Sequence, residues 1–235
     1  MSDEFVFNGV SSESFGAKIF FSEVDNGAAE EYDQLSVPGR SGDLLLDLKR
    51  RPNKPHVYSG IIYENFQENY ANLKAYLLSL IGYQRLTDTF HPNEFYYAVF
   101  DKELEVIVDR ERDMGKFKLE FNRKPQRFLL SGEQVTTLTA DGTITNPTRF
   151  NSQPLLRVYG AGNLGINGDT ITISQADGYT DIDCELMDAF KGLESRNQYV
   201  TLTNYKFPVL VPGENGISLG SGITKVEITP RWWTI

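Results

Sequence analysis

The feature that most constrains this chain is a series of short runs in which β-branched or aromatic residues alternate with polar ones. Each run is bounded by Gly, Pro, Asn or Asp, as the strands of β-proteins usually are. Residues 103–109 and 116–121 alternate with a period of two, as strands do. In the first run, Leu104, Val106 and Val108 share one face, and Ile107 lies on the other face with Glu103 and Glu105. We interpret the charged segment DRERDMG between them as a hairpin turn closed by Gly115. Together with similar runs, these segments predict a mainly β fold; the other runs are residues 17–24, 35–42, 56–64 and 94–101.

One segment has the period of an α-helix instead. Its apolar residues recur at steps of three or four and are Phe66, Tyr70, Leu73, Leu77, Leu80 and Ile81. Asn65 is expected to cap the start of this helix, with Glu68 at the capping-box spacing. Gly82 follows the last apolar position, where a left-handed C-terminal cap belongs. We therefore expect one helix, packed against a sheet.

The domain boundary is expected in the segment TADGTITNPTRFNSQP, which has no apolar periodicity and is rich in Thr, Asn, Gly and Pro. This places a connector at residues 139–153, between an N-terminal domain of residues 1–138 and a C-terminal domain of residues 154–235. After the connector, short strands separated by Gly- and Asn-rich turns predict a second β-sandwich. Residues 187–195 are expected to interrupt it with a turn or two of helix. The predicted fold has two β-sandwich-like domains, the first with a single packed helix.

Charge and cysteine content exclude several classes of protein. The 235 residues include 23 basic and 32 acidic side chains, a net charge of −9, which argues against binding to the phosphates of nucleic acids. The single cysteine, Cys184, excludes an internal disulfide and a cysteine-based zinc site. The acidic start MSDEFVFNGV lacks the basic region of a signal peptide, and no apolar run approaches the roughly 18 residues of a membrane span. We expect a soluble chain made in a reducing compartment, without membrane insertion.

One glycine motif is a candidate for a dinucleotide-binding site. Gly160, Gly162 and Gly165 form a literal G-x-G-x-x-G after a strand-like run, and Asp181 and Asp183 lie near the distance where a ribose-binding acid is expected. A pyrophosphate would need a helix N-terminus directly after these glycines. The chain continues instead with a turn and a β-branched run. We interpret the glycines as loop and turn residues and predict no cofactor.

The remaining candidates for chemistry favour structural roles. Asp181, Asp183 and Glu185 would share one face of a strand, opposite Ile182, Cys184 and Leu186. This face could be a calcium site or a glycosidase acid pair, but a solvated acidic face over a buried apolar one is the favoured interpretation. The two histidines, His56 and His91, stand in no nucleophile or metal motif. We therefore predict no catalytic residue, no metal site and no enzymatic activity.

Two short segments are candidates for contacts with partners. The Trp232–Trp233 pair could stack on a sugar or anchor a neighbouring subunit, but strand neighbours point to opposite faces, so we expect one of the two in the core. The basic run at residues 49–51 could pair with acids of a neighbouring subunit.

The chain also carries a series of motifs in a fixed order. They are FVFNGVSSESFGAKI, VPGRSGDLLL, NLKAYLLSLIGYQRLTDTFHPNEFYYA, GKFKLEFNRKPQRFL, NPTRFNSQPLLRVYGAG and ITPRWWTI. Their order resembles that of the distal tail (Dit) proteins of long-tailed phages and prophages of Gram-positive bacteria, over nearly the whole chain. No single motif is diagnostic. With Arg40 in the second motif, the candidate oligomer or partner contacts are Arg40, Lys49, Arg50, Trp232 and Trp233.

This resemblance implies a structural protein of the virion tail tip, assembled in the bacterial host cytoplasm. The N-terminal belt domain is expected to close a ring, generally a hexamer, around the DNA passage. It would contact the tail tube protein on one side and the tail-associated baseplate hub protein on the other. The C-terminal domain is expected to be galectin-like, and some family members hold receptor-binding proteins there. The chain has no room for the inserted sugar-binding modules or arm extensions of larger members.

Three classes of function remain to be distinguished. A ring subunit predicts a discrete oligomer, a carbohydrate-binding module for host cell-wall glycans predicts a monomer with glycan affinity, and a glycoside hydrolase predicts two carboxylates about 5–9 Å apart in a cleft. The ring subunit is favoured, because the acidic charge suits a channel through which DNA slides without specific binding. Glu103, Glu105 and the acids of DRERDMG are candidates for the channel lining. The basic residues nearby could instead form ion pairs between subunits; they are Arg110, Arg112 and Lys116.

Overall fold

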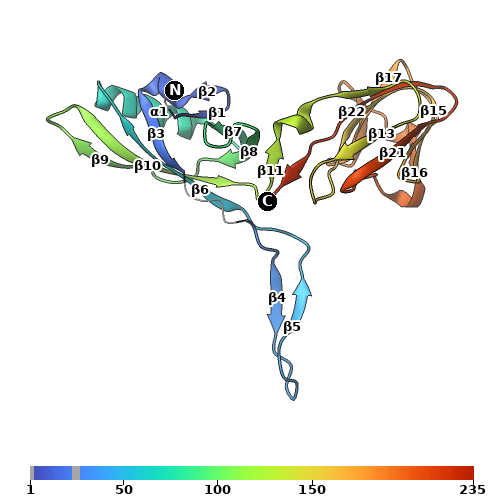
Figure 1. Cartoon of the computed structure of the whole chain (residues 1–235), viewed down its shortest axis with the longest axis horizontal. Coiled ribbons are helices and arrows are strands. Elements are labelled where there is room, and N and C mark those ends of the chain that lie inside the picture. Colours follow the sequence, from blue (N-terminus) through green and yellow to red (C-terminus); the bar gives the residue numbers. More distant parts are fainter. Residues whose placement is uncertain (1–2, 23–26) are drawn as a thin grey trace. The chain divides into compact units, whose positions relative to one another are not determined.

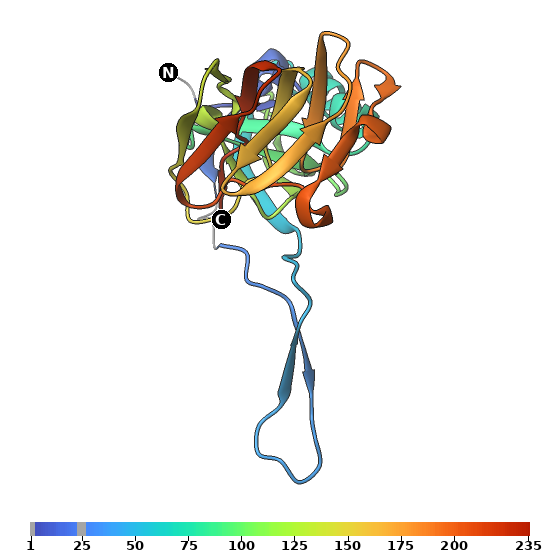
Figure 2. The same cartoon turned by 90° about the vertical axis from the view of Figure 1, so that its right-hand side faces the viewer.

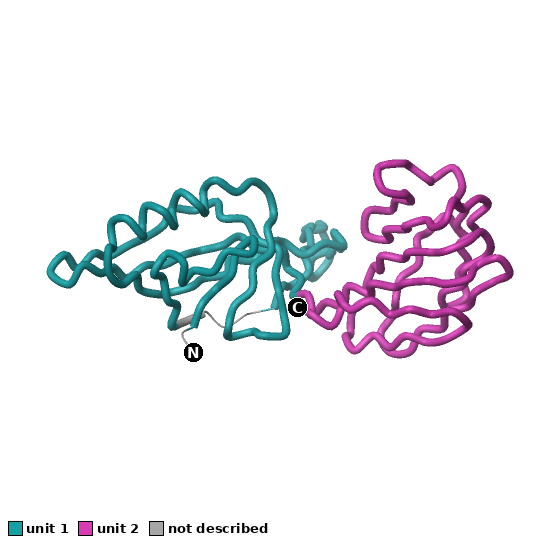
Figure 3. Tube along the Cα trace, turned by 90° about the horizontal axis from the view of Figure 1, so that it is seen from above, with its two compact units in different colours: residues 1–127, 235 teal, residues 128–234 magenta. Residues whose placement is uncertain are grey.

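A computed structural model describes residues 3–22 and 27–235. The chain forms two compact units, unit 1 with residues 1–127 and 235 and unit 2 with residues 128–234 (Figure 3). Strands dominate both units, and the described residues contain one α-helix, so the predicted mainly β class is confirmed. Each unit has its own buried core.

Unit 1 is built on an antiparallel sheet with the strand order β2–β1–β7–β8–β10–β6–β3 (Figure 1). Its strands are β1 (Phe5–Phe7), β2 (Val10–Ser11), β3 (Ala17–Ser22), β6 (Lys54–Ile62), β7 (Gln84–Asp88), β8 (Glu94–Val99), β9 (Glu105–Asp109) and β10 (Met114–Arg123), and a 3-10 helix, η1, covers Ser12–Phe15. β6 and β10 pair along their whole length, and β9 pairs with the first half of β10. Among the described residues, β3 pairs only with β6 and β9 only with β10. Neither strand has a second strand partner, although Ile19 of β3 donates its backbone N–H to the carbonyl oxygen of Asp3.

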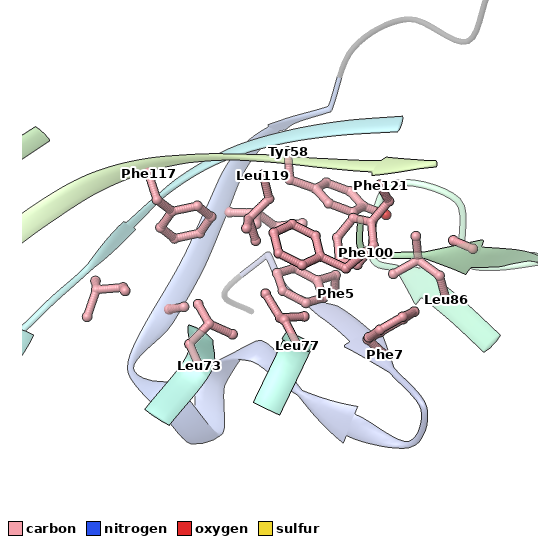
Figure 4. Close-up of a cluster of buried hydrophobic side chains, with 14 of the residues drawn as sticks. Phe5, Phe7, Tyr58, Leu73, Leu77, Leu86, Phe100, Phe117, Leu119 and Phe121 are labelled. Atoms are coloured by element: carbon pink, nitrogen blue, oxygen red, sulfur yellow. The ribbon is translucent and has the colours of Figure 1, made fainter. Parts of the chain in front are cut away.

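The core of unit 1 lies between this sheet and helix α1 (Phe66–Ser79). Leu73 and Leu77 point from the helix toward Phe117 and Leu119 of β10 (Figure 4). Alternate residues of β10 are buried, as the period of two predicts. Each such apolar side chain contributes about 1.5–3 kcal/mol when it is fully buried. The predicted helix and its packing against a sheet are therefore found, with Phe66, Leu73 and Leu77 as its buried residues.

Both ends of α1 differ from the expected capping. Asn65 has a left-handed backbone (φ 46°) and makes no side-chain cap, because a capping residue needs an extended backbone. Instead, the side chain of Asn69 donates a hydrogen bond to the carbonyl oxygen of Glu64. The helix ends at Ser79, before the expected Gly82, and Ile81 is 92% exposed instead of belonging to the apolar stripe.

The DRERDMG turn between β9 and β10 is confirmed, but Gly115 has another role. Asp113 supplies the left-handed residue (φ 48°), and the carboxylate of Asp109 accepts from two backbone N–H groups of the turn. Gly115 lies in β10, where an added Cβ would come within 2.2 Å of the ring of Phe66. Glycine is required there by close packing against the helix.

Unit 2 is a β-sandwich of two antiparallel sheets. The six-stranded sheet has the order β12–β22–β14–β17–β18–β19 and the five-stranded sheet the order β13–β21–β15–β16–β20. The elements of unit 2 and its boundary are β11 (Arg127–Leu129), η2 (Leu130–Glu133), β12 (Thr136–Leu138), β13 (Gly142–Asn146), β14 (Leu155–Gly160), β15 (Gly162–Ile166), β16 (Asp169–Ile173), β17 (Tyr179–Asp183), β18 (Asp188–Lys191), β19 (Glu194–Ser195), η3 (Asn197–Tyr199), β20 (Val200–Leu202), η4 (Thr203–Tyr205), β21 (Gly213–Leu219), β22 (Ile223–Thr229) and β23 (Trp233–Thr234). Between the sheets lie Leu156, Val158 and Ile182, together with Cys184, which is 1% exposed.

Two segments of unit 2 differ from the sequence-based expectation. Strand β13 lies within the expected connector of residues 139–153 and pairs with β21, and residues 128–138 belong to unit 2. Residues 187–195 form strands β18 and β19 and not a helix. Met187 and Gly192 have left-handed backbones, and a helix cannot continue through them.

A two-stranded hairpin completes unit 1. β4 (Tyr32–Leu35) and β5 (Leu44–Asp47) pair only with each other, and Figures 1 and 2 show no third strand beside them. The Pro-Gly-Arg segment forms the turn. The sequence suggested a strand at residues 35–42, but residues 36–42 are not in a strand. Every residue from 32 to 50 is exposed. We call residues 32–47 the hairpin arm.

Candidate functional site

The hairpin arm presents apolar side chains on both of its faces. The register pairs Asp33 with Leu46 and Leu35 with Leu44, so three leucines share one face. These leucines are 38–48% exposed. Leu45 is 57% exposed and lies with Tyr32 on the opposite face. The arm is therefore an apolar surface in contact with solvent on two sides.

At the base of the arm, ion pairs join the segment that leads into it to the segment that leads out of it. The Arg50 guanidinium lies 2.8 Å from a carboxylate oxygen of Glu31, and Arg51 lies 2.6 Å from Glu30. Arg51 also donates to the carbonyl oxygen of Ala28. Backbone hydrogen bonds link Glu31 with Leu48 and Arg50. Arg50, a candidate for pairing with another subunit, thus has an acidic partner within its own chain.

Two other candidate contacts, Arg40 and Lys49, lie on exposed parts of the same segment. Arg40 is in the turn of the arm, where its backbone N–H donates to the carbonyl oxygen of Val37. Lys49 has a left-handed backbone and donates its N–H to the carboxylate of Asp47. Their contact with a partner stays a prediction.

The tryptophan pair divides between core and surface. Trp232 is 5% exposed and packs in the core of unit 2, which leaves it no surface for a partner. Trp233 is half-buried, stacks on Phe150 with ring centroids 4.6 Å apart, and donates its indole N–H to the carbonyl oxygen of Asn151. Trp233 is the member of the pair that remains a candidate contact.

The acidic strand face, which we expected to be solvated, is exposed at Glu185 but buried at Asp181 and Asp183. Asp181 and Asp183 are each about 5% exposed, and each receives two hydrogen bonds from one guanidinium, Arg157 for Asp181 and Arg231 for Asp183. The apolar face is buried at Ile182 and Cys184, whereas the strand ends at Asp183 and Leu186 points into solvent.

The pKa of Asp183 reflects these contacts. Burial alone would raise it, but the hydrogen bonds from Arg231 and from the backbone N–H of Leu186 lower it below its ordinary value. These neighbours hold the carboxylate of Asp183 in its charged form. Asp183 would have to lose them to act as a catalytic acid or as a calcium ligand.

The two histidines flank a buried carboxylate in unit 1. The Tyr58 hydroxyl donates to Asp88 at 2.6 Å, the backbone N–H of His91 donates at 2.8 Å, and a ring nitrogen of His56 lies 3.5 Å away. Burial alone would raise the pKa of Asp88. The hydrogen bonds from His56 and Tyr58 and the charge of His91 outweigh burial and lower this pKa to about 2. The cluster ties β6 to the end of β7 and to the loop that follows it, and no Ser or Cys side chain lies among these contacts.

The glycine motif has a structural role. Gly160 and Gly222 both have positive φ angles, and an added Cβ at either would come within 2.1 Å of a backbone oxygen of the opposing loop. Gly162 approaches the carbonyl oxygen of Ser221 in the same way. The motif leads into strands β15 and β16 and not into a helix. Gly160 and Gly162 allow two turns to pass closely, as the sequence suggested, whereas Gly165 lies within strand β15.

The surface of the described residues includes two grooves of different character. One, of about 260 Å³, is lined by Lys102, Glu103, Glu105, Lys118 and Glu120, so it mixes both signs of charge. The other, of about 510 Å³, crosses the five-stranded sheet of unit 2. It is lined by small and polar residues, namely Asp141, Gly142, Thr143, Gly165, Asn167, Gly168, Asp169, Thr170, Gly216, Ile217 and Ser218. Neither groove brings an aromatic ring to its lining.

Within residues 3–22 and 27–235, no group of three or more His, Cys, Asp or Glu side chains is placed to hold a metal ion. In the same part of the chain, no helix has the length and apolar character to span a membrane.

Comparison with known proteins rests on structure. No family model matches the sequence, and no curated protein matches it. The crystal structure of SPP1 Dit (gp 19.1), described as a paradigm of the hub adsorption apparatus in phages that infect Gram-positive bacteria, matches with a TM-score of 0.75 over 100% of both chains, at 12% sequence identity. The chain has a Dit fold. At this identity, the similarity shows the fold alone.

Two structures of the phage P2 baseplate in its activated conformation, with Ca and with Sr, match with TM-scores of 0.49 and 0.48. Both are 10% identical and cover 97% of this chain, and 98% and 97% of the matched chains.

Proposed function

We propose that this Dit-like chain is a structural subunit of a phage tail tip, forming a ring that joins the tail tube to the hub and adhesion proteins and leaves a channel for DNA. The observation that carries the proposal is the shared fold with SPP1 Dit over the full length of both chains, at a TM-score of 0.75. We further propose a hexamer, located at the virion tail tip and assembled in the host cytoplasm.

Two strands of unit 1 that have a strand partner on one side only support self-assembly. β3 and β9 lie on opposite sides of the β6–β10 pair, and each has a strand partner on one side only among the described residues. Exposed strand edges invite pairing with another chain. Because the two edges are different, a contact between them is heterologous, and repeating such a contact forms a ring when its rotation closes on the first copy.

The charge of the chain supports passage of DNA. The net charge of −9 is multiplied when copies assemble, so DNA is repelled at close approach. Glu103 and Glu105 are exposed, as a channel lining requires. Lys102 and Lys118 lie beside them, and Arg112 is 3.9 Å from Asp109 within the same hairpin. The lining by this hairpin remains a proposal with its own test below.

The alternative functions have weaker support. A glycosidase would need two carboxylates that meet a substrate, whereas Asp181 and Asp183 are buried against arginines. A sugar-binding module would favour a flat aromatic face, and the groove on the five-stranded sheet is lined by glycine, threonine and aspartate. Neither arrangement favours binding or hydrolysis of a glycan.

Native mass spectrometry of the full chain tests the proposal. The expected result is one closed oligomer, with about six times the chain mass of 26.6 kDa. A monomer that persists to high micromolar concentration would contradict the ring. Measurable glycan affinity of such a monomer would favour the sugar-binding module instead.

A further inference from the structure

We infer that the groove on the five-stranded sheet of unit 2 binds an extended, basic segment of a partner protein other than a second copy of this chain. The inference goes beyond the proposed ring, which assigns no partner to this sheet. The groove crosses strands β13, β21, β15 and β16 and has a volume of about 510 Å³. That volume lies within the roughly 300–1,000 Å³ of ordinary ligand-binding clefts. We call it the unit 2 groove.

Two glycines keep the floor of the unit 2 groove low. The register places Thr143 beside Gly216 on the outer face of the sheet, and it places Gly165 between Ser218 and Thr170 on the same face. An added Cβ at Gly216 would meet no atom within 4 Å, so the space above this residue is open. At Gly165, the missing Cβ makes room for the hydroxyl of Ser218. Glycines inside strands often mark a place where another backbone approaches closely.

Polar groups along the unit 2 groove are available to a ligand. Within residues 3–22 and 27–235, the hydroxyls of Thr143, Thr170 and Ser218 make no hydrogen bond to another residue. The half-buried carboxylate of Asp169 likewise has no ion pair or hydrogen bond in this part of the chain. Hydroxyls donate and accept, and carboxylates accept, so they can bond the N–H and C=O groups of a peptide backbone.

A hydrogen-bond network fixes the shape of the unit 2 groove. Asn167 donates its amide to the side-chain oxygen of Asn215 at 2.7 Å and accepts the backbone N–H of Gly216 at 3.1 Å. Asn215 is fully buried, and its own amide donates to the carbonyl oxygens of Val211 and Gly213. The groove is therefore formed before a ligand arrives, which lowers the entropic cost of binding.

Charge identifies the ligand as basic. Asp141 and Asp169 are the charged residues of the lining, and the lining contains no Lys or Arg. The strands of this sheet carry Asp169 and Glu214 and likewise no basic residue. The backbone N–H of Leu219 orients the carboxylate of Asp141 at 2.8 Å. Carboxylates without a basic neighbour in the groove attract Lys and Arg side chains and repel phosphate groups.

The partner is a protein different from this chain. The sequence has one run of three consecutive basic residues, at 49–51. Arg50 and Arg51 of this run already pair with Glu31 and Glu30 of their own chain. A second copy, with a net charge of −9, would be repelled by an acidic groove. A glycan would favour an aromatic ring in the lining, and the lining has none.

The test selects peptides from a displayed library of random sequences on the immobilised full chain. Selected peptides should contain Lys and Arg more often than the unselected library, and fluorescence anisotropy then measures their Kd. Gly216→Leu fills the open floor without a change of charge and should weaken binding at least about thirtyfold. The double variant Asp141→Asn, Asp169→Asn should weaken binding at least about tenfold and make it less sensitive to salt. Thermal melting checks that each variant is folded.

A matched control separates the groove from the overall negative charge. Glu13→Gln with Glu64→Gln removes the same charge from exposed positions of unit 1 and should leave the Kd of the peptides as in the wild type. Selection without enrichment of Lys and Arg, or equal binding by the wild type and Gly216→Leu, would overturn the inference. Binding of a neutral glycan in place of peptides would overturn it as well. A monomeric chain whose peptide binding is lost in Gly216→Leu would support the groove while it contradicts the ring.

Discussion

Asp183 provides a sharp test of how unit 2 uses its buried acids. Its carboxylate accepts two hydrogen bonds from Arg231, both 2.8 Å, and two from the backbone N–H groups of Glu185 and Leu186, both 3.0 Å. In Asp183→Asn, an amide NH₂ would face one of the guanidinium N–H groups, and the charge that strengthens the other contacts is lost. A hydrogen bond to a charged group contributes about 1.5–3 kcal/mol. Because Arg231 is a quarter exposed, we expect a loss near the lower end.

The substitution should therefore destabilise unit 2 by about 2 kcal/mol and lower its Tm by roughly 8 °C. Differential scanning calorimetry at neutral pH measures this shift. Asp177→Asn is the control, because Asp177 is also ion-paired, to Lys191, but its side chain is 76% exposed. The Tm of that variant should match the wild type.

The pH dependence gives a second measurement with a defined sign. The pKa of Asp183 is lowered in the folded chain, so its contribution is present above the ordinary value of 3.8 and is lost as the pH falls through the lowered value. The Tm difference between wild type and Asp183→Asn should shrink below about pH 4. A variant as stable as the Asp177 control at neutral pH would show that the acidic face is solvated after all. A rise in Tm with calcium that the variant loses would identify a cation site.

Four further predictions concern other parts of the chain. The wild type should lose about 2 kcal/mol of stability between roughly pH 4 and pH 2, since the pKa of Asp88 is lowered to about 2. This acid-dependent loss should be absent in Asp88→Asn, and acid titration followed by circular dichroism checks this. Gly115→Ala should cost about 1–3 kcal/mol through overlap with Phe66, while Gly216→Ala, which has no atom within 4 Å of an added Cβ, should be tolerated in chemical denaturation. Gel-shift titration near 150 mM salt should give a Kd for double-stranded DNA weaker than about 100 μM; micromolar, salt-sensitive binding would reveal a basic stripe. If charge reversal at Glu103, Glu105 and Asp109 preserves the oligomer yet gives no DNA retention, that hairpin does not line a channel.

The elements that depend on local sequence periodicity could be predicted. The alternation in β10 and the apolar stripe of α1 are set by neighbours two or four residues apart, and the structure has both. The glycine motif could also be interpreted, because the absence of a following helix is visible in the sequence. Residues 187–195 could not, since left-handed backbones at Met187 and Gly192 turn a helix-like segment into two strands.

The contacts that decide the roles of the acids and leucines are distant in sequence. Arg157 and Arg231 reach Asp181 and Asp183 across 24 and 48 positions, so a strand with alternating acids looked solvated. The run Leu44–Leu46 has the composition of a buried strand, yet the structure leaves it in solvent. Sequence periodicity shows which residues share a face but not whether that face meets the chain's own core or another molecule.

The single thiol of the chain makes the hairpin arm accessible to selective chemistry. Cys184 is 1% exposed, and burial, together with the charge of Asp183, raises its pKa to about 12. Maleimides and disulfide reagents attack the thiolate, so Cys184 is inert to them at neutral pH in the folded chain. A cysteine introduced at exposed Ser41, in the turn of the arm, would be the single reactive site without removal of the native one. A fluorophore placed there would report the surroundings of the arm in the free subunit and in the assembled particle.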